Sequence, residues 1–139
     1  MSKSNAFETD LLELIFNAVA ITGIAQDNAA PVALEVALHT ADPADAGDQS
    51  TSEVAYTGYA RVTVARTSGG WNVAGNSVSN TAAINFPECT GGSAMATHFS
   101  VGPVGSNVAL YHGALSSSLA ISSGITPSFG VGELTITED

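Results

Sequence analysis

An acidic segment from Asp42 to Glu53 carries the side chains best suited to bind a metal ion. It spans twelve residues, with glycine at the sixth position and glutamate at the twelfth, as in a calcium-binding EF-hand loop. Such a loop needs oxygen ligands at its third and fifth positions, where this segment has alanine. We therefore predict no EF-hand here. A solvated turn is the favoured interpretation, because aspartate is a turn former, and a cation held by Asp42, Asp45 and Asp48 is the alternative.

Histidine and serine are the residues that could support hydrolytic chemistry. His39, His98 and His112 lie far apart in the chain, and no cysteine or carboxylate stands at zinc-ligand spacing beside them. Serine is abundant, but the sequence has no Gly-x-Ser-x-Gly elbow. Its glycine-rich segments lack the third glycine of a dinucleotide loop and the lysine of a phosphate loop. We predict no enzyme activity, no metal and no cofactor. A deep pocket lined by two of the three histidines would favour an enzyme instead.

The three basic residues are so few that we expect the arginines to be paired. Arg61 follows two tyrosines, Tyr56 and Tyr59, into a predicted strand. Bidentate pairing with a carboxylate is one expectation for Arg61, and an exposed charge at a sheet edge is the other. Tyrosine and arginine are enriched at protein interfaces, so all three side chains are candidate interface residues. A place in the core is the alternative for the tyrosines.

Charge and length limit the partners of the chain. The 139 residues carry 13 acidic and three basic side chains, for a net charge of −10. Three cations cannot neutralise a run of phosphates, so we expect neither nucleic acid nor an anionic membrane as a partner. Since 45% of the residues are apolar, the chain has enough of them to form a core. The single cysteine, Cys89, excludes an internal disulfide.

One helix is predicted near the N-terminus, from Ala6 to Val19. Asn5 and Glu8 have the spacing of a capping box, which would begin it. Apolar residues then recur at helical spacing and must pack against the same domain or a neighbour. The large members of this stripe are further candidate interface residues: Phe7, Leu11, Leu14 and Ile15, with Ala18 completing the stripe.

After Pro31 the hydrophobic period changes to two, which indicates strands separated by glycine and proline turns. We predict a mainly β fold, an antiparallel β-sandwich or jelly-roll-like domain with one N-terminal α-helix. The length fits a single domain, 1–139, with a helical arm at 1–25 and the β-sandwich at 30–139. The expected strands are Val32–His39, Tyr59–Arg66, Trp71–Val73, Ser77–Asn80, Ala83–Phe86, Thr97–Val101, Ala109–Ala114, Leu119–Ser122 and Leu134–Thr137.

These elements contain short sequences whose order resembles a known family. The chain resembles small virion proteins of tailed bacteriophages, often labelled phage tail fibre proteins, some of which look like capsid decoration (cement) proteins. The leading helix with its paired leucines also fits, and the resemblance covers nearly the whole chain. The sequences are LHTADP at 38–43, DAG at 45–47, YTGYAR at 56–61, INFP at 84–87, GGS at 91–93, THFSVG at 97–102, LYHGAL at 110–115, ISSG at 121–124 and LTI at 134–136.

The resemblance implies a structural virion protein without catalytic residues. Because the chain is short and has no internal repeat, we expect a capsid decoration protein rather than a fibre shaft. It would bind the major capsid protein on the outer capsid surface as a homotrimer, where an acidic protein is kept away from the packaged DNA. A tail-associated protein, either a minor tail protein or a short fibre or tip domain, is the alternative. A carbohydrate-binding module is disfavoured, because Trp71 is the only tryptophan.

Overall fold

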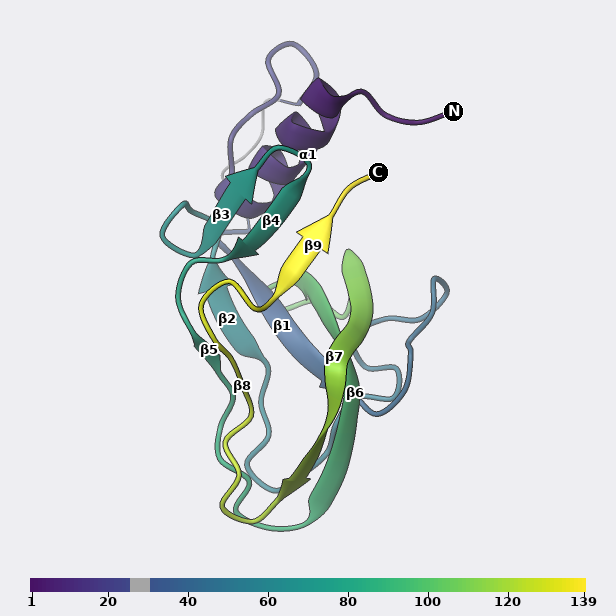
Figure 1. The fold of residues 1–139 in the computed structure, drawn as a ribbon, viewed down its shortest axis with the longest axis vertical. Coiled ribbons are helices and arrows are strands. Elements are labelled where there is room, and N and C mark those ends of the chain that lie inside the picture. The colour runs from purple at the N-terminus through teal and green to yellow at the C-terminus, as the bar shows by residue number, and fades with distance from the viewer. Residues whose placement is uncertain (26–30) are drawn as a thin grey trace. The chain divides into compact units, whose positions relative to one another are not determined.

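The structure, a computed structural model, describes residues 1–25 and 31–139 (Figure 1). Its strands form sheets in the orders β2-β1-β6-β7, β3-β4-β9 and β5-β8. The pairs β3–β4, β4–β9 and β6–β7 are antiparallel. The predicted mainly β class with one N-terminal helix is confirmed. The elements are α1 (Asn5–Asn17), β1 (Ala33–His39), β2 (Val62–Ala65), β3 (Trp71–Ala74), β4 (Ser77–Asn80), β5 (Ile84–Asn85), β6 (Ser93–Pro103), β7 (Tyr111–Ser122), β8 (Ser128–Phe129) and β9 (Thr135–Thr137).

The contacts within the chain divide it into two compact units, which we describe separately. Unit 1 comprises Met1–Leu34, Val64–Ile84 and Phe129–Asp139, and unit 2 comprises Glu35–Thr63 and Asn85–Ser128. The arrangement as a single domain with an arm at 1–25 and a sandwich at 30–139 stays a prediction. Within the described residues, no helix is long and apolar enough to cross a membrane.

In unit 1, helix α1 begins one residue earlier than expected and ends two residues earlier. Ser4 is the N-cap, because its backbone is extended and its side-chain oxygen accepts a bond from Phe7 N at 3.3 Å. The predicted cap, Asn5, is wrong, since Asn5 already lies inside the helix. Ala18 ends the helix in a left-handed conformation with φ of +56°, and Val19 N then donates to Glu13 O.

The buried face of α1 lies one residue along from the predicted apolar stripe. Glu8, Leu12 and Phe16 are buried at four-residue spacing, and α1 packs beside β3 and β4 (Figure 1). The shift follows from Phe16, whose ring meets Trp71 edge-on with 4.8 Å between centroids. The candidate interface residues of the helix are therefore only partly covered, with 41% of Phe7 exposed. Those that are half-buried are Leu11, Leu14 and Ile15.

Strand β7 joins two segments that the sequence separates, Ala109–Ala114 and Leu119–Ser122. The antiparallel register with β6 shifts in its middle, where Leu115–Ser118 lie opposite the single residue Thr97. Such a bulge lets one continuous strand absorb extra residues without losing its partner. The serines at this point break the apolar alternation, which explains why the sequence indicates two strands.

Strand β2 is shorter than predicted, and β8 was not predicted at all. The segment Tyr59–Arg66 is extended only over its second half, because Tyr59 N donates to Tyr56 O in a turn. Gly58 in that turn has φ of +99°, a conformation that favours glycine. Strand β8 has only two residues and pairs with the equally short β5. By contrast, β4 has the predicted bounds.

Candidate functional site

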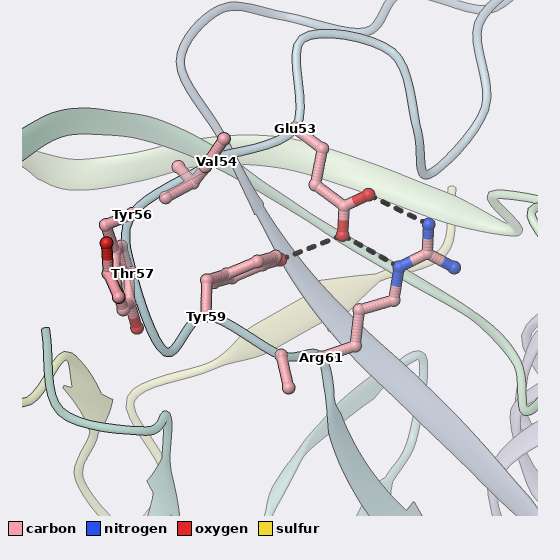
Figure 2. A pocket seen from close by; sticks show the side chains of 8 residues that line it. Glu53, Val54, Tyr56, Thr57, Tyr59 and Arg61 are labelled. Atoms are coloured by element: carbon pink, nitrogen blue, oxygen red, sulfur yellow. Dashed lines mark hydrogen bonds and ion pairs between the residues drawn. The ribbon is translucent and has the colours of Figure 1, made fainter. Parts of the chain in front are cut away.

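Arg61 is the centre of a polar network in unit 2 that connects segments remote in sequence. Its guanidinium binds Glu53 through two parallel bonds, Nε to Oε1 at 2.8 Å and Nη2 to Oε2 at 2.9 Å (Figure 2). It also donates to Ser106 O at 3.1 Å and to Asn107 Oδ1 at 3.0 Å. Glu35 Oε2 lies 3.6 Å from Nη1. The Glu53 carboxylate raises the pKa of Arg61. The structure thus has the bidentate carboxylate pair expected for Arg61.

Tyr59 extends the Arg61 network to the backbone of β1. Its hydroxyl donates to Glu53 Oε1 at 3.0 Å (Figure 2). It also accepts a bond from Leu38 N at 3.1 Å. The ring stacks on Phe86, with 6.2 Å between centroids and an angle of 8° between planes. Burial raises the pKa of Tyr59 far above its ordinary value, so the hydroxyl keeps its proton and its donor role.

Tyr56 lies next to this network and is itself buried. Its ring meets Tyr59 edge-on at 5.4 Å, and its hydroxyl donates to Pro87 O at 2.7 Å. The polar atoms of Tyr56, Tyr59 and Arg61 are therefore bonded within unit 2. Their participation in an interface stays a prediction, and a surface contact there would use their ring edges and aliphatic atoms.

The same segment lines an open depression of about 660 Å³ (Figure 2). None of the three histidines is among its lining residues, so the arrangement that would have favoured an enzyme is not formed at this depression. Most of its charged and phenolic groups bond to one another, which suits a rigid scaffold. The lining residues are Glu53, Val54, Ala55, Tyr56, Thr57, Tyr59, Ala60 and Arg61.

His39 is buried in unit 2 between two hydrogen-bond partners. Nδ1 lies 2.8 Å from Thr51 O, and Nε2 lies 2.7 Å from Ser100 Oγ. Since a carbonyl oxygen only accepts, Nδ1 carries the proton and Nε2 accepts from the serine. His39 and Ser100 are both fully buried, so this serine–histidine pair is closed to a substrate. It anchors the 41–52 loop, together with Gln49, which donates to Glu35 O at 3.0 Å.

We expect the stability of the protein to fall as the pH drops below about 6.5, because of His39. Burial lowers the pKa of His39 from 6.5. The unfolded chain then binds a proton more readily than the folded one, so this contribution is complete above pH 6.5 and is lost at lower pH. Urea denaturation at several values between about pH 7.5 and 5 should show the decline. A His39→Gln variant, which keeps a donor and an acceptor, should show a flatter slope, and an unchanged slope would contradict this assignment.

The acidic loop is organised as a turn in which Asp48 bonds to Ser50, while Asp42 and Asp45 share His112. Asp48 Oδ1 accepts bonds from Ser50 N at 2.8 Å and Ser50 Oγ at 2.6 Å, which lowers the pKa of Asp48. Asp42 Oδ1 accepts from Ala44 N at 2.9 Å. The imidazole of His112 lies between two carboxylates, 3.1 Å from Asp42 and 3.4 Å from Asp45. Within residues 1–25 and 31–139, no group of three or more His, Cys, Asp or Glu side chains is placed to hold a metal.

Arg66 has a role that the sequence did not reveal. In unit 1 its guanidinium donates to three backbone carbonyls, Ile15 O at 2.7 Å, Leu14 O at 2.5 Å and Pro31 O at 2.7 Å. Two of these belong to the last turn of α1, whose carbonyls lack helical partners and carry the negative end of the helix dipole. The side chain is 7% exposed, and burial lowers its pKa. Carbonyl partners leave no signal in a sequence, because every residue has one.

Two comparisons with known proteins complete this description. Residues 2–137 match a family model described as Podophage GP4 fiber I protein gp80. The match spans nearly the whole chain and both units. It confirms the resemblance to structural proteins of tailed bacteriophages. No curated protein matches the sequence.

Proposed function

Because the chain belongs to the podophage GP4 fiber I protein gp80 family, and is therefore a bacteriophage structural protein, we propose that it is a non-catalytic subunit of the tail fibre apparatus. This was the alternative drawn from the sequence, and the description of the family favours it over capsid decoration. The observation that carries the proposal is the extent of the family match, residues 2–137. A protein of this kind works by being rigid and by binding other virion subunits.

The polar networks of the two units support a mechanical role. In unit 2, Arg61 binds two loop segments, one at Glu53 and one at Ser106 and Asn107, through side-chain and backbone acceptors. In unit 1, Arg66 fixes the end of α1. Both networks consist of several internal hydrogen bonds, which restrict motion of the backbone segments that they join. We propose that these networks keep the subunit stiff when it is loaded within an assembled appendage.

Capsid decoration is the second candidate. The chain is short and acidic, with a net charge of −10, which suits a compact protein bound as trimers to the major capsid protein outside the shell. A partner that binds only the assembled lattice stabilises that lattice by mass action. Three linked contacts per trimer would add avidity.

Labelling of the protein on intact virions tests these proposals. Gold-labelled antibodies, or extra density from a fused domain in a virion reconstruction, should lie on the tail fibres. Label on the shell would overturn the fibre proposal and favour decoration. In that case, purified empty shells should resist heating better with added protein than without it. Label on neither structure would contradict both candidates.

A further inference from the structure

The side chain of His112 connects the tip of the acidic loop, Asp42–Asp45, to strand β7 in unit 2. Its Nδ1 lies 3.1 Å from Asp42 Oδ1, and its Nε2 lies 3.4 Å from Asp45 Oδ1. The imidazole is 25% exposed, whereas the side chain of Asp42 is 56% exposed and that of Asp45 is fully exposed. The loop tip therefore lies on the surface, and the ring provides a polar contact between the tip and the strand.

This arrangement needs a proton on both nitrogens of the His112 ring. An ionised carboxylate only accepts hydrogen bonds, and a neutral imidazole has a single N–H to donate. The two contacts of His112 are therefore both hydrogen bonds only when the ring is doubly protonated and carries a positive charge. In the neutral ring, one nitrogen presents a lone pair to a carboxylate oxygen, and that contact becomes repulsive. Histidine ordinarily gains or loses this second proton between about pH 5 and 8.

The other titratable groups around this contact are Asp42 itself and two further histidines. The bond from Ala44 N and, more weakly, the charges of His112 and His98 hold the pKa of Asp42 below its usual value, so Asp42 stays ionised throughout this range. In the β6–β7 register His98 pairs with Ala114, two residues from the pair of Ser100 with His112, so both imidazoles lie on the same face of the hairpin. The Nδ1 atom of His98 lies 2.9 Å from Thr97 Oγ1.

We propose that protonation of His112 fixes the loop tip to strand β7, and that loss of this proton releases it. The imidazolium binds both carboxylates, and the neutral ring can keep at most one of them. Because the tip is exposed, its release changes the surface of the subunit without exposing the core. This device goes beyond the proposed function, and it is the same for a fibre subunit and for a decoration protein.

His39, at the base of the same loop, responds to acid in the opposite direction. Burial lowers the pKa of His39, so its charged form is unfavourable in the folded protein. A charge on His98 lowers that pKa further. Acid therefore weakens the buried attachment of the loop through His39 while it strengthens the surface contact through His112. A measurement of this contact must report on the loop tip rather than on the stability of the whole chain.

The test places a nitroxide spin label on an Ala46→Cys variant and records its mobility by electron paramagnetic resonance. Ala46 is exposed and directly follows the loop tip, and the native Cys89 is fully buried, so the label reacts at position 46. We expect the ratio of immobile to mobile label to be about two- to fivefold higher at about pH 5.5 than at about pH 8, the range that an exposed ion pair allows. Circular dichroism checks that the protein is folded at both pH values.

Three substitutions in the labelled protein assign the response to His112. His112→Gln removes the titrating ring, so the label should be equally mobile at both pH values. Asp45→Asn should keep the tip in contact at both, because an amide can donate to the neutral ring nitrogen and accept from the protonated one. His98→Gln is the matched control on the neighbouring strand, and it should retain the response of the parent.

Equal mobility of the label at both pH values would contradict the role of His112, as would greater mobility at the lower pH. A folded His112→Gln variant that keeps the response of the parent would contradict it as well. If His112→Gln fails to fold, Asp45→Asn decides the question, because its side chain is fully exposed. An undiminished pH response in Asp45→Asn would then overturn the assignment. The measurement uses purified protein, so its outcome is independent of where virion labelling places the subunit.

Discussion

Replacement of Arg66 by methionine should lower the free energy of unfolding by about 3–5 kcal/mol, because it removes the donor from three partly buried carbonyl oxygens. Methionine fills a similar length of the cavity, so the loss reports the polar contacts more than the packing. The carbonyls of Leu14 and Ile15 end α1, and their negative dipole loses its cation as well. Urea denaturation of both proteins measures the difference.

Lys3 provides the control for Arg66, because it is a cation of the same unit whose own side chain is 32% exposed. Its Nζ lies 3.1 Å from Glu138 Oε2. Lys3→Met should cost less than Arg66→Met, because the Lys3 ammonium keeps more contact with solvent than the Arg66 guanidinium. A loss below about 1 kcal/mol for Arg66→Met would mean that water replaces the guanidinium without penalty.

Replacement of Arg61 by methionine should lower the free energy of unfolding by about 2–4 kcal/mol. Glu53 and Glu35 would then face each other without the cation that now lies between them. The loop that supplies both Ser106 O and Asn107 Oδ1 would lose its donor. Because the guanidinium and Glu53 retain some solvent contact, the expected loss is smaller than for Arg66.

A double-mutant cycle separates the ion pair from the rest of the Arg61 network. Glu53→Gln removes the negative charge and keeps the shape, so the double variant should lose less than the sum of the single losses. Arg61→Lys should be intermediate, since lysine keeps the charge but cannot form two parallel bonds. Additive losses would contradict a direct coupling between Arg61 and Glu53.

Local sequence pattern predicted most of the elements but not the contacts between them. Strand β4 has its predicted bounds because its turns are marked by glycine and asparagine. The apolar pattern of α1 pointed to Leu11 and Leu14, whereas the structure buries Leu12 and Phe16. The neighbour that decides this is Trp71, some fifty residues away in the chain, and a periodicity count cannot include it.

For the candidate site, the sequence predicted the type of interaction but not the residue that takes part in it. The sequence indicated a carboxylate for Arg61, and the choice of Glu53 depends on the turn that brings the two side chains together. For Arg66 no partner could be predicted, since the acceptors are main-chain atoms. His39 illustrates the same limit, because its burial between Thr51 and Ser100 follows from tertiary folding alone.

The placement of the aromatic residues makes the two units optically distinct. Trp71, the only tryptophan, is fully buried in unit 1, while all three tyrosines, Tyr56, Tyr59 and Tyr111, belong to unit 2. Tryptophan fluorescence therefore follows the melting of one unit, and tyrosine absorbance follows the other. Transitions that coincide would mean that the chain melts as one cooperative domain, as its length predicts. Transitions that separate would assign a melting temperature to each unit without any added probe.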